Sequence, residues 1–91
     1  MSPAAPSPAL TSALTAVRTC LADELDIPAA RIAPSDQLDL LERADSVRLM
    51  EVVARLENQY DVEFDDDRVR AADTVADLAA LVVDTLETEG R

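Results

Sequence analysis

The chain has 91 residues, enough for one small domain, and its net charge is −11 because 19 acidic residues outnumber 8 basic ones, all arginine. The absence of histidine excludes Ser-His and Cys-His catalysis and ordinary zinc sites, and a single glycine leaves no glycine-rich loop for phosphates. So acidic a surface disfavours nucleic acid and anionic membranes and favours partners with basic patches. We therefore expect neither an enzyme nor a metal site.

The first residues, MSPAAPSPA, predict a disordered tail over residues 1–8, in which Ser7-Pro8 resembles an N-cap and a first-turn proline. The next stretch predicts a helix that ends at Asp26-Ile27-Pro28, and Cys20 beside its apolar stripe is interpreted as a small buried thiol. The stripe has helical spacing and consists of Leu10, Leu14, Val17, Leu21 and Leu25. No secretory leader and no apolar run of membrane-spanning length is recognisable, so we expect a cytoplasmic protein, and we expect a monomer.

Residues 28–44 form a long connection without a sustained hydrophobic period. Four apolar residues in it are expected to pin it to the core: Ile32, Leu38, Leu40 and Leu41. Loops of this length are uncommon in small domains and often have a function.

Residues 46–60 predict an amphipathic helix with two apolar stripes. The expected core stripe is Leu49, Val52, Val53, Leu56 and Tyr60. A second strip, Val47, Met50 and Ala54, lies on the other side of Ser46, and Arg48, Glu51, Arg55, Asn58 and Gln59 fill the polar face. The second strip either packs against the short helix that follows or stays exposed and meets partners beside Ser46.

The remaining chain predicts a short link at residues 61–64, one or two helical turns at 65–71, and a last helix that starts with a capping-box-like Thr74. Its apolar face is Val75, Leu78, Val82 and Leu86, and residues 89–91 form a C-terminal tail. The expected fold is all-α: a small four-helix bundle with three principal helices, one short helix and a long loop between the first two. An EF-hand calcium loop that begins at Asp61 is excluded, because it places Asp66 where glycine is needed and Ala72 where glutamate is needed.

Ser46 has two interpretations. Asp-Ser pairs before a helix are common N-caps, and the local pattern alone favours that interpretation. A helix N-terminus also suits an attached phosphate, because free N–H groups and the helix dipole favour negative charge there.

The wider sequence resembles the acyl carrier protein family over residues 9–88. The features that carry the resemblance follow one another at the spacing of that family. They are Asp45-Ser46-Val47 at the start of a helix, Leu56-Glu57, the aromatic Tyr60, the acidic link Asp61 to Asp67, and Thr74-Val75. The triplet alone is a weak signal, but the ordered set is fairly specific.

The resemblance implies that a separate phosphopantetheinyl transferase joins 4′-phosphopantetheine, taken from coenzyme A with Mg²⁺, to the Ser46 hydroxyl. The arm then holds an acyl, aminoacyl or polyketide unit as a thioester, supplied by a cargo-loading ligase or acyltransferase. Downstream biosynthetic enzymes would dock basic patches on the helix 46–60. The residues implied at that contact are Asp45, Val47, Arg48, Met50, Glu51, Ala54 and Arg55.

Two features depart from the family pattern. Glu42 and Arg43 stand where a glycine usually precedes the Asp-Ser pair, and Arg48 and Arg55 interrupt a polar face that is nearly all acidic in carriers of fatty-acid synthesis. The arginines favour a specialised pathway, such as secondary metabolism of the polyketide or nonribosomal-peptide kind, and the start at Met1 favours a free-standing carrier. The alternative is a non-catalytic acidic helical interaction module without a prosthetic arm.

Overall fold

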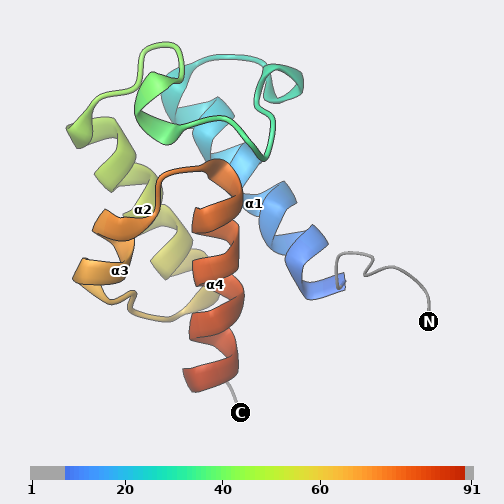
Figure 1. Cartoon of the computed structure of the whole chain (residues 1–91), viewed down its shortest axis with the longest axis vertical. Coiled ribbons are helices and arrows are strands. Elements are labelled where there is room, and N and C mark those ends of the chain that lie inside the picture. The colour runs from blue at the N-terminus through green and yellow to red at the C-terminus, as the bar shows by residue number, and fades with distance from the viewer. Residues whose placement is uncertain (1–7, 90–91) are drawn as a thin grey trace.

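The computed structural model describes residues 8–89 and contains four α-helices in this range: α1 (Pro8–Leu25), α2 (Ser46–Tyr60), α3 (Asp66–Ala71) and α4 (Val75–Glu89). α1 runs opposite to α2 and α4 and packs against both (Figure 1). The expected all-α bundle is therefore confirmed. The expected tail up to Ser7, including the Ser7 cap, and the last residues, 90–91, lie outside the described residues. Pro8, expected in the first tail, already belongs to α1, and Glu89, expected in the C-terminal tail, still belongs to α4.

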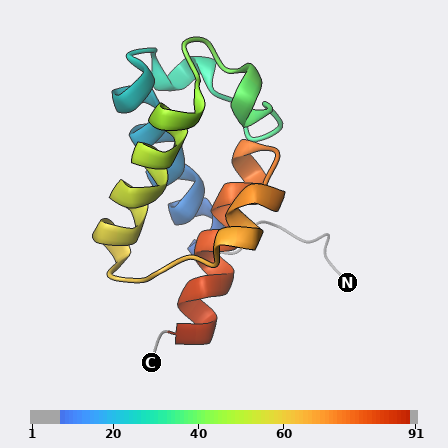
Figure 2. The same ribbon diagram turned by 90° about the vertical axis from the view of Figure 1, so that its left-hand side faces the viewer.

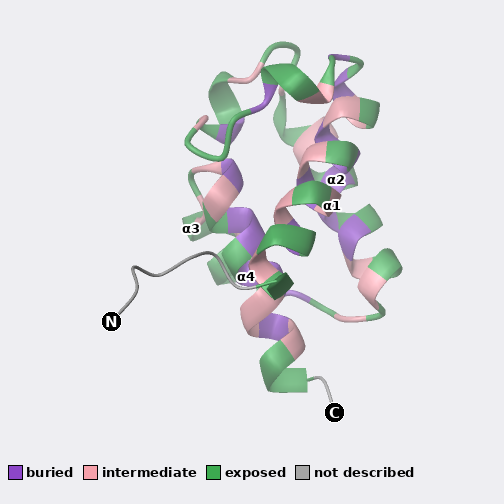
Figure 3. Ribbon diagram, turned by 90° about the vertical axis from the view of Figure 1, so that its right-hand side faces the viewer, coloured by how far each residue is buried: buried purple, intermediate pink, exposed green. Residues whose placement is uncertain are grey.

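The core lies between α1, α2 and α4, where the three apolar stripes meet (Figure 3). Its largest fully buried side chains are Leu21, Leu25, Ile32, Leu56, Val17, Val52, Val75 and Val82. Leu49 and Tyr60, expected in the core stripe of α2, and Leu86 of α4 are only partly buried. Cys20 is buried, as interpreted, and burial raises the pKa of its thiol.

Two of the helices end at an aspartate in the left-handed conformation. Asp26 follows α1 with φ of 57°, and Asp61 follows α2 with φ of 55°. In each case the next residue donates a hydrogen bond to a carbonyl in the last turn, from Ile27 N to Ala22 O at 3.1 Å and from Val62 N to Glu57 O at 3.0 Å. Aspartate tolerates this backbone better than most residues, so these ends form without glycine.

Backbone hydrogen bonds join the long loop between α1 and α2 to the segment at the start of α4. It contains the 3₁₀ turns η1 (Ala29–Arg31) and η2 (Leu38–Leu40), and Leu38 N donates to Asp73 O at 2.8 Å while Val75 N donates to Asp36 O at 3.0 Å. Ile32 and Leu38 are buried and Leu41 is partly buried, as expected. The expectation for Leu40 is wrong: it is 75% exposed, because the last position of η2 points away from the core.

α3 is the least embedded helix. None of its residues is buried, and it lies across α4 on the side that faces α2 (Figure 2). Arg68 of α3 forms an ion pair with Asp84 of α4. None of the helices in residues 8–89 combines the length and apolar character needed to cross a membrane.

Candidate functional site

The start of α2 separates the roles of Asp45 and Ser46. Asp45 has an extended backbone, with φ of −147° and ψ of 171°, and its Oδ1 accepts a hydrogen bond from Arg48 N at 2.8 Å. Asp45 is therefore the N-cap, and the interpretation of Ser46 as the cap is wrong. Ser46 is the first helical residue, it is exposed, and its hydroxyl forms no hydrogen bond within residues 8–89.

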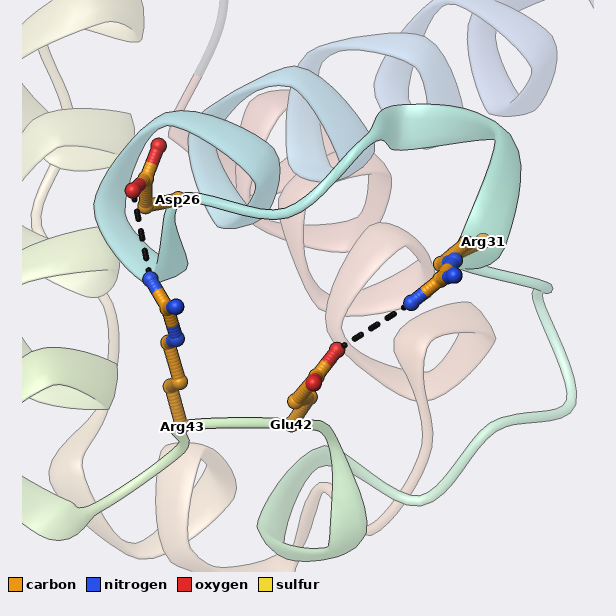
Figure 4. A network of polar contacts seen from close by, with 4 residues as sticks. All are labelled: Asp26, Arg31, Glu42 and Arg43. Carbon is orange, nitrogen blue, oxygen red and sulfur yellow. Dashed lines mark hydrogen bonds and ion pairs between the residues drawn. The ribbon is translucent and has the colours of Figure 1, made fainter.

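The segment that leads to Ser46 is tied to the end of α1 and to η1. Arg43 Nη1 lies 3.2 Å from Asp26 Oδ2, and Arg31 Nη1 lies 3.4 Å from Glu42 Oε1 (Figure 4). Arg43 has a φ of 68°, which favours glycine. The position where the family resemblance predicts glycine therefore does have the backbone that glycine prefers, although arginine occupies it.

Ser46 is one of the residues that line a cavity between α2 and α3 with a volume of about 280 Å³. The walls are mainly apolar and include Leu49 and Val53 of α2, Val69 of α3 and Leu78 of α4. The polar residues at this cavity are Ser46, Asp39, Arg70 and Asp73. The site thus combines an exposed, free hydroxyl with an adjoining apolar space.

The second apolar strip of α2 is exposed. Val47 is 71% exposed and Met50 is 54% exposed, and Ala54 and the neighbouring Glu51 are also exposed. Met50 also lines the cavity, so only this part of the strip faces α3. Of the two interpretations, exposure therefore applies to Val47 and Ala54. A contact with partners at these residues stays a prediction.

The two arginines on the polar face of α2 differ in their surroundings. Arg48 Nε lies 3.9 Å from Asp45 Oδ2, within the first turn. Arg55 pairs across the bundle with α1, at 3.3 Å from Asp23 Oδ2 and 3.7 Å from Glu24 Oε1. The hydrogen bond to Asp23 raises the pKa of Arg55 further above its ordinary value. Arg55 therefore joins two helices, whereas Arg48 stays within α2.

Sequence reasoning did not identify Arg70 or Val69 as residues of the site. Both come from α3, whose six residues are too few to show a clear hydrophobic period. The sequence does contain one signal for these residues, namely a single apolar residue between two arginines in Arg68-Val69-Arg70.

The residues at this site fit a phosphate-linked arm. A free hydroxyl in the first turn of a helix is next to unpaired backbone N–H groups, which favour a phosphate. The adjoining cavity offers apolar surface beyond that point.

Comparisons with known proteins point to the same region. Residues 15–82 match the family described as "Phosphopantetheine attachment site". The chain is 35% identical over 77 residues to "Acyl carrier protein 3" of Ralstonia nicotianae, covering 85% of this chain and 88% of that relative. The family match includes Ser46 and the helices α2 and α3.

Proposed function

Because this chain belongs to the acyl carrier protein family, which carries covalent 4′-phosphopantetheine, we propose that its arm is attached to Ser46 Oγ. The protein is a carrier that presents an acyl, aminoacyl or polyketide intermediate to partner enzymes in a specialised pathway. The observation that supports the attachment site best is the capping of α2 by Asp45, which leaves the Ser46 hydroxyl exposed and free.

The attachment step is a phosphoryl transfer in which Ser46 is the acceptor. The Ser46 hydroxyl forms a new oxygen–phosphorus bond, the pyrophosphate bond of coenzyme A breaks, and adenosine bisphosphate leaves. The hydroxyl proton passes to the transferase, whose Mg²⁺ neutralises the phosphates. Attachment of the arm breaks no hydrogen bond of the folded protein, because the Ser46 hydroxyl takes no part in the cap.

Once modified, the chain binds and orients but supplies no catalytic group. The terminal thiol of the arm supplies the chemistry, which is to hold the cargo as a thioester. The first turn of α2 holds the phosphate in a favourable field, because the N-terminal end of a helix carries partial positive charge. α2 packs against α1, and the full burial of Val52 and Leu56 in the core holds this helix in place relative to the rest of the bundle.

The exposed strip of α2 is the proposed contact for the transferase, the loading enzyme and the downstream enzymes. Val47, Met50 and Ala54 offer apolar contact, and Asp45 and Glu51 offer negative charge to basic patches. Arg48 is the feature of this face that favours a specialised pathway, because it would repel an enzyme adapted to an all-acidic carrier. Arg55 contributes less to that discrimination, since its charge is paired with Asp23 and Glu24.

The test is to incubate the protein with coenzyme A, Mg²⁺ and a broad-specificity phosphopantetheinyl transferase and to measure its intact mass. The wild type should gain one phosphopantetheine and Ser46→Ala should gain none. Ser35→Ala is the matched control, because Ser35 is also exposed but lies in the long loop. Modification of Ser46→Ala, or an unmodified wild type with several transferases, would contradict the assignment.

A further inference from the structure

Arg70 and Ser46 line the same cavity from two different helices. Ser46 is the first residue of α2, and Arg70 is the second-last residue of α3. Arg70 is the cation at this cavity within residues 8–89, and the other charged residues that line it are the carboxylates of Asp39 and Asp73. The lining of the cavity therefore contains the attachment hydroxyl, one cationic side chain and two carboxylates.

The charges around Ser46 leave an attached phosphate in need of a cation. Asp45 is adjacent in the chain, and Asp39 and Asp73 line the same cavity, so each would repel a phosphodiester. The helix N-terminus offsets part of this repulsion. Arginine is the side chain best suited to supply the rest, because its guanidinium donates parallel hydrogen bonds to phosphate oxygens.

Three other arginines near the site pair with a different part of the fold: Arg43 with Asp26, Arg55 with Asp23 and Glu24, and Arg68 with Asp84. Arg48 pairs with Asp45 in the first turn of α2, at 3.9 Å, and does not line the cavity. Within residues 8–89, Arg70 pairs with Asp67 of its own helix, at 3.5 Å from Oδ1, and these side chains are 73% and 89% exposed. A pair so exposed is weak, and Arg70 can leave it for a phosphate at little cost.

We propose that the Arg70 guanidinium binds the phosphodiester of the arm on Ser46 and so ties α3 to the first turn of α2 across the cavity. This rests on the proposed attachment at Ser46. α3 has no buried residue, and Arg68–Asp84 ties it to α4. Attachment of the arm adds a second contact, which joins α3 to α2 through Arg70 and the phosphodiester on Ser46. The mobility of α3, and with it the access to the cavity, then depends on whether the protein carries its arm.

The experiment compares amide hydrogen exchange of residues 66–71 before and after modification, with intact mass confirming that the arm has been added. The wild type should exchange about two- to fivefold more slowly when modified, the range that an exposed ion pair produces. Arg70→Gln should show no such slowing, and Arg70→Lys should retain part of it. The difference should shrink as salt is raised, because the pair is exposed to solvent.

Arg68→Gln is the matched control, because it removes the same charge from the same helix. The Arg68 side chain pairs with Asp84 of α4 and does not line the cavity. This variant should speed exchange in both forms and keep the slowing on modification. If the wild type gains the mass but α3 exchanges equally in both forms, or if Arg70→Gln is slowed as much as the wild type, the role of Arg70 is wrong while the attachment stands. If the mass does not increase, the attachment itself is wrong, and this inference is wrong with it.

Discussion

Arg43 and Asp26 are joined by an ion pair of 3.2 Å, and both have left-handed backbones, with φ of 68° and 57° (Figure 4). Their side chains are 54% and 90% exposed, and such a pair contributes about 0.2–1 kcal/mol. The left-handed backbone of a residue with a Cβ costs about 1–2 kcal/mol, and aspartate tolerates it better than arginine. The left-handed backbone of Arg43 therefore costs more free energy than the ion pair with Asp26 contributes.

This comparison predicts how Arg43 responds to substitution. Arg43→Gly and Arg43→Ala both lose the ion pair with Asp26, but only glycine relieves the left-handed strain. We expect the glycine variant to be more stable than the alanine variant by about 1 kcal/mol, which corresponds to roughly 4–8 °C in Tm. Thermal and urea unfolding would measure the difference. Equal stability of the two variants would mean that position 43 does not hold a left-handed backbone in solution.

The cap of α2 predicts losses of stability of different size at two adjacent residues. Asp45→Ala should lower the unfolding free energy by about 1 kcal/mol, because Arg48 N loses its acceptor. Ser46→Ala should lower it by less than about 0.5 kcal/mol, because an exposed side chain outside the cap contributes little. Asp45→Asn keeps an acceptor and serves as the control. A larger loss for Ser46→Ala than for Asp45→Ala would contradict the assignment of the cap.

The helix positions could be predicted because α1, α2 and α4 each bury one continuous apolar stripe. The period of Leu21 and Leu25 in α1, or of Val52 and Leu56 in α2, follows from this burial. Asp26 and Asp61 as helix ends fit the same pattern, since the stripe stops at each. The resemblance around Asp45-Ser46-Val47 then placed the site at the start of α2.

The remaining features depend on tertiary contacts that have no local signal. Asp45 and Ser46 are both good N-caps, and only the backbone around Arg48 N decides between them. Leu40 is apolar yet exposed, because the direction of a side chain in a 3₁₀ turn depends on where the loop is anchored. The cavity requires α3 to face α2, so the presence of Arg70 at the same cavity as Ser46 could not be predicted from either helix alone.

The start of α4 predicts a contribution of Asp77 to stability that depends on pH. Asp77 Oδ2 accepts hydrogen bonds from Thr74 N at 3.1 Å and Asp73 N at 3.0 Å, and Thr74 Oγ1 accepts one from Asp77 N at 3.0 Å. The backbone N–H of Thr74, and after it that of Asp73, hold the pKa of Asp77 below the ordinary value of an aspartate.

Because the folded pKa of Asp77 is lowered, the unfolded chain binds more protons in acid, and stability rises with pH in that window. The contribution of Asp77 should be present in full above about pH 4 and should be lost as the pH falls through the lower, folded value. Asp77→Asn should therefore have a weaker dependence of stability on pH below about 4. Urea unfolding across pH would test this, with Glu63→Gln as a control that removes another exposed carboxylate.

Arg55 and Arg48 should differ in their effect on stability. Arg55→Glu places a third carboxylate beside Asp23 and Glu24 and should lower the unfolding free energy by about 1 kcal/mol or more. Arg48→Glu should change it by less than about 0.5 kcal/mol, because a glutamate in the first turn of a helix gains from the helix dipole what it loses against Asp45. High salt should bring the two variants closer together. Equal losses at low salt would mean that Arg55 does not join α1 to α2.

The exposed strip of α2 predicts two separable contributions to docking. The probe is the transferase reaction itself, with kcat/KM measured against salt for Val47→Ala and Glu51→Gln. Glu51→Gln should lower kcat/KM about two- to fivefold at low salt and not at high salt, because an exposed charge acts through the rate of encounter.

Val47→Ala should lower kcat/KM at every salt concentration, because the loss of apolar contact is not screened. Val47 is a cleaner probe than Met50, since Met50 also lines the cavity and its truncation would change two surfaces at once. Glu87→Gln, an exposed carboxylate near the far end of α4, is the control for net charge and should leave kcat/KM unchanged. If both α2 variants behave like the wild type at all salt concentrations while the fold persists, the transferase does not dock on this strip, and its exposed apolar residues need another partner.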